Sequence, residues 1–367
     1  MRTLIRRRPS TRPGTRAARA AKPGPIQIVV TPGSGNGRAL STALRLRDAL
    51  IRRRLRTRLE VFPDLDSLHR WTKTDAEPFS TLVCVGGDGT QSTAALAALR
   101  RSVPFLPVSS GFGNLFANAF NHRSSVEGAL DLLARGQVIH SDVGRCNGEV
   151  FLCQQSYGLI ADVQEAVEAA AVPRARWQRW LAYYRAALRY LREAPPTRLR
   201  VVVDGRVVAV DAALVIVANV ETYGRWLPLT PDASPVDGLF DVYVMRGASH
   251  RQVFLKLLRR HLGIPGEESG TLLCRGQRVT VSGLRSLRDR LEALPHRLPV
   301  IVSPATAAAL ERNLGRRQAQ VPLAPGRVAW GTRQSARVGA RATRSFPAAR
   351  IAPMAARTAS PMAIHTA

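Results

Sequence analysis

The chain contains few acidic residues, few cysteines and no long apolar run. Its 367 residues include 26 Asp and Glu against 54 Lys and Arg, a formal net charge of +28. The four cysteines lack the paired spacing of a zinc site, so we interpret them as reduced, structural residues of a cytosolic protein. The longest apolar run, residues 212–220, is far shorter than the ~20 residues of a membrane-spanning helix. A Walker pattern GxxxxGK[ST] is also absent, which argues against a P-loop enzyme.

Much of the positive charge lies at the two ends. Residues 1–25 carry seven Arg and one Lys without an acid, and residues 315–367 carry nine Arg without an acid. We predict two solvated, disordered basic tails, and a transit peptide is a second interpretation of the first. The body between them is still basic, which suits a polyanionic substrate or an anionic membrane surface. No nucleic-acid-binding module is recognisable, so we expect no specific nucleic acid partner.

Residues 82–99, LVCVGGDGTQSTAALAAL, combine a short apolar strand, a glycine turn and an alanine-rich helix. This order places unpaired backbone N–H groups and a helix dipole where a phosphate can bind. The acid in the turn, Asp88, could hold Mg²⁺ or take a proton from an attacking hydroxyl. The alternative is an ordinary turn with an Asp near a helix N-terminus.

Two further segments share this order. Strand 26–30 is followed by the loop TPGSGNG at 31–37 and a helix at 40–54, and segment 103–120 contains a strand, a glycine-rich turn and a helix. Such units favour a parallel sheet with helices on both faces and all three loops at the carboxyl ends of the strands. Taken alone, the 31–37 loop could equally be a flexible surface loop.

Beyond residue 137 the pattern becomes rich in β-strands. Strands are predicted at 137–143, 150–157, 198–203, 206–218, 239–246, 277–282 and 299–302, with helices near 173–193, 249–262 and 305–312. The Asp204-Gly205 pair predicts a hairpin turn. We therefore predict a doubly wound α/β nucleotide-binding domain at 26–136 and a mostly antiparallel β-sandwich at 137–302. A helix at 303–314 returns to the first domain.

The sequence resembles the diacylglycerol kinase catalytic-domain family, which includes bacterial diacylglycerol kinases and sphingosine and ceramide kinases. The resemblance spans most of residues 26–310. TPGSGNG resembles the family's NPxSGxG loop with Thr31 in place of Asn, GGDGT at 86–90 is unchanged, and SGFGNLFA at 110–117 is similar to GTxNxxA. The other matching residues are Asp142, Phe151, Gly158, Tyr223, Gly224, Pro228, Asp237, Gly238 and Leu239.

This resemblance implies ATP-dependent phosphorylation of a lipid hydroxyl, such as that of diacylglycerol or a sphingoid base. The first domain would hold ATP and the sandwich the lipid. The residues expected to face the nucleotide are Gly33, Ser34, Gly35, Gly37, Gly86, Gly87, Asp88, Gly89, Thr90, Gly111 and Asn114. Asp88 would organise Mg²⁺ and the phosphates, or act as the base. The resemblance also implies a structural Mg²⁺ held by the carbonyls of Ser234 and Leu239 and the carboxylate of Asp237.

Two departures from the family pattern bear on activity. Phe112 replaces the usual Thr or Ser of the third loop, and the DGE motif that carries a proposed general base in bacterial members is absent. Asp289 and Glu292 are the nearest acids, and Glu292 is the candidate substitute. The alternative is a surface helix that happens to carry a Glu, with Asp88 acting alone or with weak catalysis.

Two competing functions remain at this point. An NAD kinase shares the GGDGT turn, although segment 109–117 and DGLFD at 237–241 fit the lipid kinases better. A non-catalytic lipid- or nucleotide-binding regulator of the same fold is the other. The helix near 173–193 either lies on an anionic membrane or packs in the core. We expect a cytoplasmic protein peripherally associated with the membrane, and the sequence leaves a homodimer open.

Overall fold

The computed structural model describes most of the chain between residues 24 and 318. The described residues are 24–33, 37–74, 77–111, 113–122, 124–163, 185, 188–189, 198–221, 229–247, 249–262, 264, 270–283 and 288–318. Nearly all of the predicted basic arm, of the predicted basic tail and of the predicted 173–193 helix lies outside these ranges.

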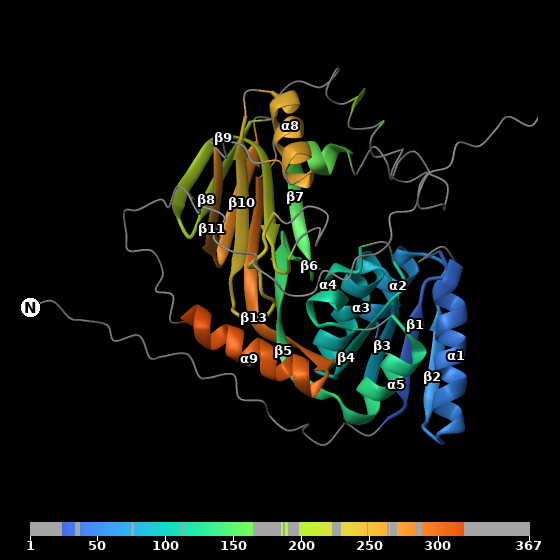
Figure 1. Ribbon diagram of the computed structural model, residues 1–367. Helices are drawn as coiled ribbons and strands as arrows, with labels where there is room; N and C mark the ends of the chain where they lie inside the picture. Colours follow the sequence, from blue (N-terminus) through green and yellow to red (C-terminus); the bar gives the residue numbers. More distant parts are fainter. Residues whose placement is uncertain are drawn as a thin grey trace, which may run out of the picture. The chain divides into compact units, whose positions relative to one another are not determined.

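The first half of the described chain alternates strands and helices (Figure 1). Its elements are β1 (Ile26–Val30), α1 (Arg38–Arg52), β2 (Thr57–Val61), α2 (Leu65–Lys73), β3 (Thr81–Gly86), α3 (Asp88–Arg101), β4 (Phe105–Ser109), α4 (Leu115–Ala119) and α5 (Val126–Arg135). The four strands are parallel neighbours in the order β2-β1-β3-β4. Strands β3 and β4 are mainly apolar and buried along their whole length, as expected for a parallel sheet covered on both faces.

Helices cover both faces of this parallel sheet, because successive side chains of a strand point to opposite sides. On β3, Leu82 and Cys84 join a core that includes Leu68 of α2 and the alanines of α3. The alternate residues Val83 and Val85 join a second core with α1 and α5. The predicted doubly wound α/β domain is therefore confirmed.

The second half is dominated by antiparallel strands. Its elements are β5 (Gln137–Cys146), β6 (Glu149–Phe151), β7 (Gln154–Gly158), β8 (Leu199–Val203), β9 (Arg206–Ala218), β10 (Phe240–Arg246), α8 (His250–His261), β11 (Thr271–Gly276), β12 (Arg278–Gly283), β13 (Arg288–Val302) and α9 (Pro304–Gln318). Strands β7 to β12 pair antiparallel around a core of mainly valine side chains. The predicted hairpin joins β8 to β9, with positive φ at Asp204 and Gly205. The antiparallel sandwich is confirmed.

Three local predictions differ from the structure. The predicted strand 150–157 is two strands, β6 and β7, with different partners. Strand β11 was not predicted, and β13 begins at Arg288, eleven residues before the predicted strand at 299–302. Helix-forming residues such as Leu291, Glu292 and Ala293 occur in the early part of β13. They are nevertheless extended, because that part pairs with both β5 and β12 and buries Leu291 and Ala293 in the sandwich core.

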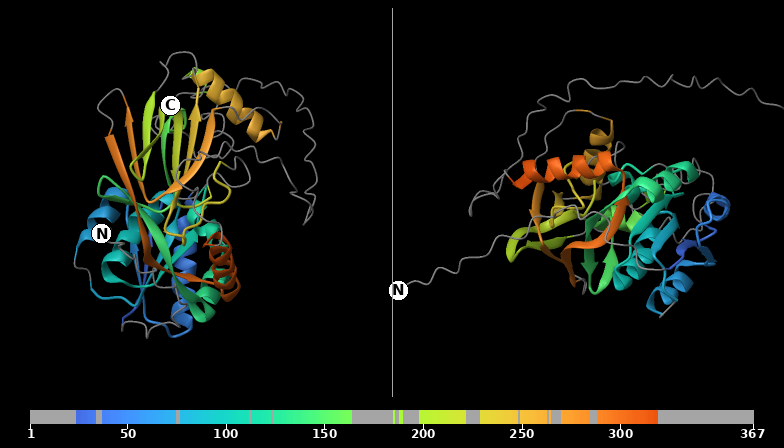
Figure 2. Two further views of the ribbon diagram at one scale, coloured as in Figure 1. Left: turned by 90° about the vertical axis from the view of Figure 1, so that its left-hand side faces the viewer. Right: turned by 90° about the horizontal axis from the view of Figure 1, so that it is seen from below.

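Strands β5 and β13 run through both halves of the described chain (Figures 1 and 2). The early part of β13 pairs with β12 of the sandwich, and its end pairs with β4 of the parallel sheet through Val300 and Phe105. The register between β5 and β13 shifts between Leu294 and Leu298, which marks a β-bulge. Helix α9 then contributes Ala307 to the core beneath α3. A pair of shared strands, rather than a single-stranded linker, thus joins the two halves.

Candidate active site

The loops after β1, β3 and β4 meet at the carboxyl ends of the parallel strands. The hydroxyl oxygens of Thr31 and Thr90 lie 2.9 Å apart, which joins the first loop to the second. The backbone N–H of Ser110 donates to the carbonyl of Gly86 at 3.0 Å, which joins the second loop to the third. The predicted convergence of the three loops is therefore present in their described parts.

Glycine is required where the second and third loops touch. A Cβ added to Gly111 would lie 2.5 Å from Cα of Gly87, which is too close for any side chain. By contrast, a Cβ on Gly33 would have nothing within 4 Å, so this glycine borders open space. Gly37 precedes α1 with φ 80°, a conformation that favours glycine. The loops therefore combine tight backbone contact with an open side at Gly33, while Ser34, Gly35 and Phe112 lie outside the described residues.

Asp88 is the first residue of α3, and its carboxylate points at the start of α4. Its Oδ1 accepts a hydrogen bond from the backbone N–H of Phe116 at 3.2 Å and lies 3.6 Å from Sγ of Cys153, which donates to it. The residue is only half-buried and the next one, Gly89, is exposed, so the turn is not sealed from solvent. Burial raises the pKa of Asp88, and the hydrogen bonds from Phe116 and Cys153 oppose that rise.

Asn114 shapes the third loop. It has φ 52° and ψ 38°, its Oδ1 accepts from the N–H of Gly111 at 2.8 Å, and its Nδ2 donates to the carbonyl of the same residue at 2.9 Å. The side chain therefore closes the loop on itself. Its predicted contact with a nucleotide stays a prediction.

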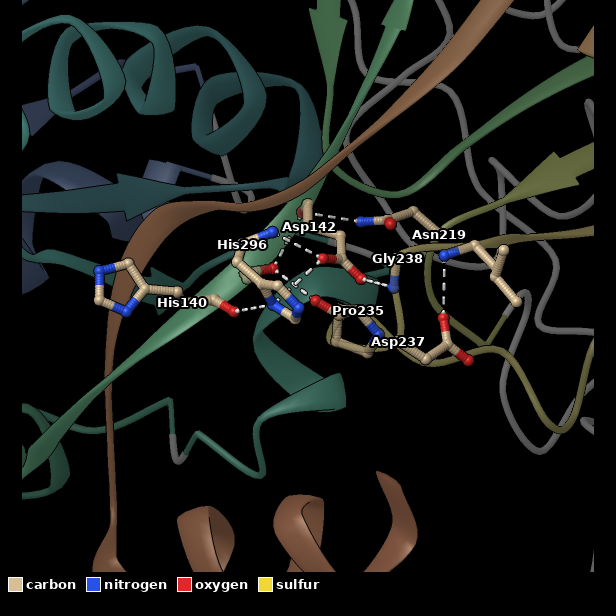
Figure 3. Close-up of polar contacts among 9 residues, drawn as sticks. His140, Asp142, Asn219, Pro235, Asp237, Gly238 and His296 are labelled. Carbon is tan, nitrogen blue, oxygen red and sulfur yellow. Dashed lines mark hydrogen bonds and ion pairs between the residues drawn. The ribbon is translucent and has the colours of Figure 1, made fainter. Parts of the chain in front are cut away.

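Asp142 on β5 is fully buried opposite the bulge of the paired strand β13 (Figure 3). Its two carboxylate oxygens accept from different segments: Oδ2 from the N–H of Gly238 at 2.6 Å, and Oδ1 from the N–H of His296 at 2.8 Å. His296 lies in the bulge of β13 with φ 53°. One side chain therefore ties β5 to the bulge and to the loop before β10.

Burial raises the pKa of Asp142 to about 6, although the N–H groups of Gly238 and His296 favour its ionised form. The imidazole of His296 also lies 3.6 Å from the Asp142 carboxylate. This carboxyl group therefore holds its proton to a higher pH than an exposed Asp does, at a point where three segments are fixed.

Asn219 links the segments that carry Asp88 and Asp142. Its Nδ2 donates to the carbonyl of Asp142 at 3.2 Å and to that of Leu152 at 2.8 Å, and its backbone N–H donates to the carbonyl of Cys153 at 2.8 Å. The thiol of Cys153 in turn donates to the carboxylate of Asp88. A continuous series of hydrogen-bonded residues therefore connects the glycine turn to Asp142 on β5.

The sequence reasoning assigned no site role to Cys153, Asn219 or His296, and it noted Asp142 only as a motif match. One local signal was available: Asn219 is a polar residue inside the apolar run 212–220, where a buried amide needs partners. Nothing local marks His296, because its backbone partner lies 154 residues earlier.

Glu292 lies on the exposed side of β13. Its register neighbours are Arg278 on β12 and Arg145 on β5, while the adjacent Leu291 and Ala293 face the core. The alternative of a surface helix is wrong, because this segment is a strand. The role of Glu292 as a base stays a prediction. The other nearby acid, Asp289, accepts from the side chain of Asn147 at 2.7 Å.

The three residues expected to hold a structural metal share the short loop before β10. Asp237 Oδ1 accepts from the N–H of Leu239 at 3.1 Å, and Ser234 is buried. Within the described part of the chain, no group of three or more His, Cys, Asp and Glu residues could hold a metal ion. One carboxylate with two carbonyls is an oxygen-only donor set, which fits a hard cation that keeps several waters.

Comparison with known families agrees with this arrangement. The model of the diacylglycerol kinase catalytic domain matches residues 25–146, and the model of the YegS C-terminal NAD kinase beta sandwich-like domain matches residues 155–295. The two matches follow one another along the chain, separated by residues 147–154. The chain belongs to the diacylglycerol kinase catalytic-domain family.

Two relatives named diacylglycerol kinase are similar to this chain over different lengths. The diacylglycerol kinase of Mycobacterium tuberculosis strain H37Rv is 26% identical over 295 residues, which are 78% of this chain and 94% of that protein. The diacylglycerol kinase of Bacillus subtilis is 27% identical over 189 residues, 50% of this chain. The match spans 61% of the length of the Bacillus protein.

Solved structures of family members share the fold. A putative diacylglycerol kinase from Bacillus anthracis superposes with a TM-score of 0.59 at 19% identity, covering 77% of this chain and 98% of that one. A second structure of a diacylglycerol kinase from the same organism gives 0.56 at 18% identity. Among the described residues of the present chain, no helix is both long and apolar enough to cross a bilayer.

Proposed function

We propose that this protein is an ATP-dependent lipid kinase that transfers the γ-phosphate to a lipid hydroxyl, such as that of diacylglycerol or a sphingoid base. The observation that carries the proposal is the convergence of three glycine-containing loops at the carboxyl ends of β1, β3 and β4, with Asp88 in their midst. Membership of a family whose relatives are named diacylglycerol kinase supports the choice of a lipid alcohol.

Phosphoryl transfer depends mainly on positioning and on charge stabilisation. Close backbone contact between Gly87 and Gly111 leaves no side chain between those loops, and Gly33 and Gly37 border open space. Backbone N–H groups in these loops would bind the nucleotide phosphates. The sandwich domain would hold the lipid, as the family resemblance implies.

Asp88 is the residue we assign to the reacting hydroxyl. Its raised pKa makes its carboxylate a better proton acceptor than an exposed Asp, and its partial exposure keeps it accessible. A bound Mg²⁺ would supply charge neutralisation to the transferring phosphate. Asp88 would hold such an ion at the phosphates, and Ser234, Asp237 and Leu239 would hold a structural one. Glu292 is the candidate substitute for the general base of the missing DGE motif.

The test is lipid phosphorylation by the purified protein. Labelled ATP and Mg²⁺ are supplied with diacylglycerol, sphingosine, other lipid alcohols and NAD in separate reactions. Label in a lipid product supports the proposal and identifies the acceptor. Label in NAD alone would make the protein an NAD kinase and refute it.

A non-catalytic regulator that binds nucleotide is the second candidate. The observation in its favour is that Oδ1 of Asp88 already accepts from Phe116 and Cys153, so catalysis requires the other oxygen, or a rearrangement. Nucleotide binding measured by calorimetry, without label in any acceptor of the panel, would select this candidate.

A further inference from the structure

Helix α8 lies on the outer face of the sandwich domain (Figure 1). Its inner side buries Val253 and Leu257 in a core with Leu214 of β9 and Tyr243 of β10. Arg260 on the same side lies over the ring of Tyr243, 5.9 Å from its centroid. These contacts fix which side of the helix faces away from the sheet.

The opposite side of α8 is both apolar and basic. Leu255 and Leu262 are 47% and 59% exposed, and Ile264 just beyond the helix is 49% exposed. Helical spacing places Arg251 and Arg259, which are both exposed, on the same side as Leu255. Residues 250–264 contain four Lys or Arg and no acid. We name this side, formed by Arg251, Leu255, Leu258, Arg259 and Leu262, the outer face of α8.

Exposed leucines among arginines, without any acid, match the composition of helices that lie at the surface of anionic membranes. The apolar side chains can enter the boundary between head groups and acyl chains, while the guanidinium groups stay among the lipid phosphates. We propose that the outer face of α8 docks this protein on an anionic phospholipid bilayer. The proposal rests on the proposed function in one respect: a kinase that phosphorylates a lipid would take its acceptor from that bilayer.

A second exposed segment has a similar composition and provides a matched control. Ile51 and Leu55, at the end of α1, are 54% and 44% exposed, and Arg52, Arg53 and Arg54 lie between them. Because α1 begins after the carboxyl end of β1 and runs back along the sheet, its end lies away from the glycine loops. The α8 face lies instead on the sandwich domain, which would hold the lipid. We therefore assign docking to α8 and not to the end of α1.

The test is co-sedimentation of the full chain with vesicles of phosphatidylcholine alone, or of phosphatidylcholine mixed with phosphatidylglycerol, without nucleotide. We expect at least tenfold tighter binding to the mixed vesicles, weakening as salt rises. The double variant Leu255→Glu, Leu262→Glu should lose at least about tenfold of this binding, and Arg259→Gln about fivefold. The control Ile51→Glu, Leu55→Glu should bind as the wild type does.

Unchanged binding by the α8 variant, or loss of binding only in the α1 control, would overturn the proposal. A wild-type dimer that the α8 variant converts to monomer, seen by analytical ultracentrifugation, would also overturn it, because the face would then bind a second copy of the chain. Circular dichroism melting confirms that both variants are folded. Since binding is measured without ATP, a failure of the kinase reaction leaves this result intact, and a failure of docking leaves phosphorylation of detergent-dispersed lipid intact.

Discussion

Asp88 and Asp142 are both buried or half-buried carboxylates that accept backbone hydrogen bonds, but they do different work. Asp88 sits in a turn that is partly open to solvent and accepts one N–H and one thiol. Asp142 is fully buried and accepts two N–H groups from segments far away in the chain. The first geometry leaves a carboxylate available for chemistry, whereas the second uses both oxygens to fix backbone.

The difference between them gives each aspartate a different expected phenotype. Removing the charge of Asp88 should affect the reaction and spare the fold. Removing that of Asp142 should affect stability first, because two backbone N–H groups donate to its carboxylate.

The largest expected effect is that of Asp88→Asn on lipid phosphorylation. The amide oxygen can still accept from the N–H of Phe116, so the start of α4 should be preserved, but the proton acceptor is lost. We expect the turnover rate to fall by about 10³-fold, measured with labelled ATP. Thermal unfolding within a few degrees of the wild type is the control, and near-normal transfer would contradict the role of Asp88.

The second effect is that of Asp142→Asn on stability. An amide can satisfy only one of the N–H groups of Gly238 and His296, so we expect a loss of about 2 kcal/mol in the free energy of unfolding. Urea denaturation at several pH values measures it.

The same variant should change how stability depends on pH. The pKa of Asp142 is raised to about 6 in the folded protein, above its ordinary value of 3.8. The folded state therefore binds the proton more tightly, and this contribution is complete below about pH 4 and is lost as the pH rises through 6. The unfolding free energy of the wild type should fall across this range relative to that of the variant. Parallel curves would contradict the assignment.

A third test concerns backbone contact between the glycine loops. In Gly111→Ala the new Cβ would meet Cα of Gly87 at 2.5 Å, so the loops must separate. We expect about 2 kcal/mol of lost stability and roughly tenfold weaker ATP binding by calorimetry. The matched control for stability is Gly33→Ala, where nothing lies within 4 Å of the new atom. Equal losses of stability from both variants would show that close contact is unimportant.

The smallest effect should come from Cys153, which joins the two aspartates through Asn219. Replacing it by Ala removes the donor at 3.6 Å from Asp88, and we expect a loss of about 1 kcal/mol, or roughly fivefold in turnover. Cys153→Ser retains a donor and should recover most of the rate. Cys84→Ala, which removes a buried thiol of the same core, should leave the ratio of turnover to KM unchanged.

The glycine turn could be found from the sequence because its parts are contiguous. GGDGT follows an apolar strand and begins a helix, so one short segment predicts the strand, the turn and the position of Asp88. Three such units predict the parallel sheet. The partners of Asp142 lie 96 and 154 residues away, at Gly238 and His296, and only the paired strands bring them together. Motif spacing in the sequence therefore could not predict these two hydrogen bonds.

Strand β13 shows the same limit for secondary structure. Leu291, Glu292 and Ala293 favour a helix locally, yet pairing on both sides and burial in the sandwich core outweigh that preference. The predicted end of this strand, residues 299–302, was recognisable because it is a buried apolar run in the parallel sheet. The local conformational preference of a segment thus predicts its secondary structure well when the strands that pair with it favour the same conformation.

The sharing of β5 and β13 by the parallel sheet and the sandwich has a consequence for dissection of the protein. A cut near residue 295 would separate the end of β13 from β5, and a cut near residue 137 would separate β4 from β13, so either cut would leave backbone amide groups unpaired at an exposed sheet edge. Neither half should therefore be obtained as a well-behaved fragment, and chemical denaturation should melt both together in one cooperative step. Any hinge motion between the two halves should therefore bend the paired strands β5 and β13 at the bulge between Leu294 and Leu298.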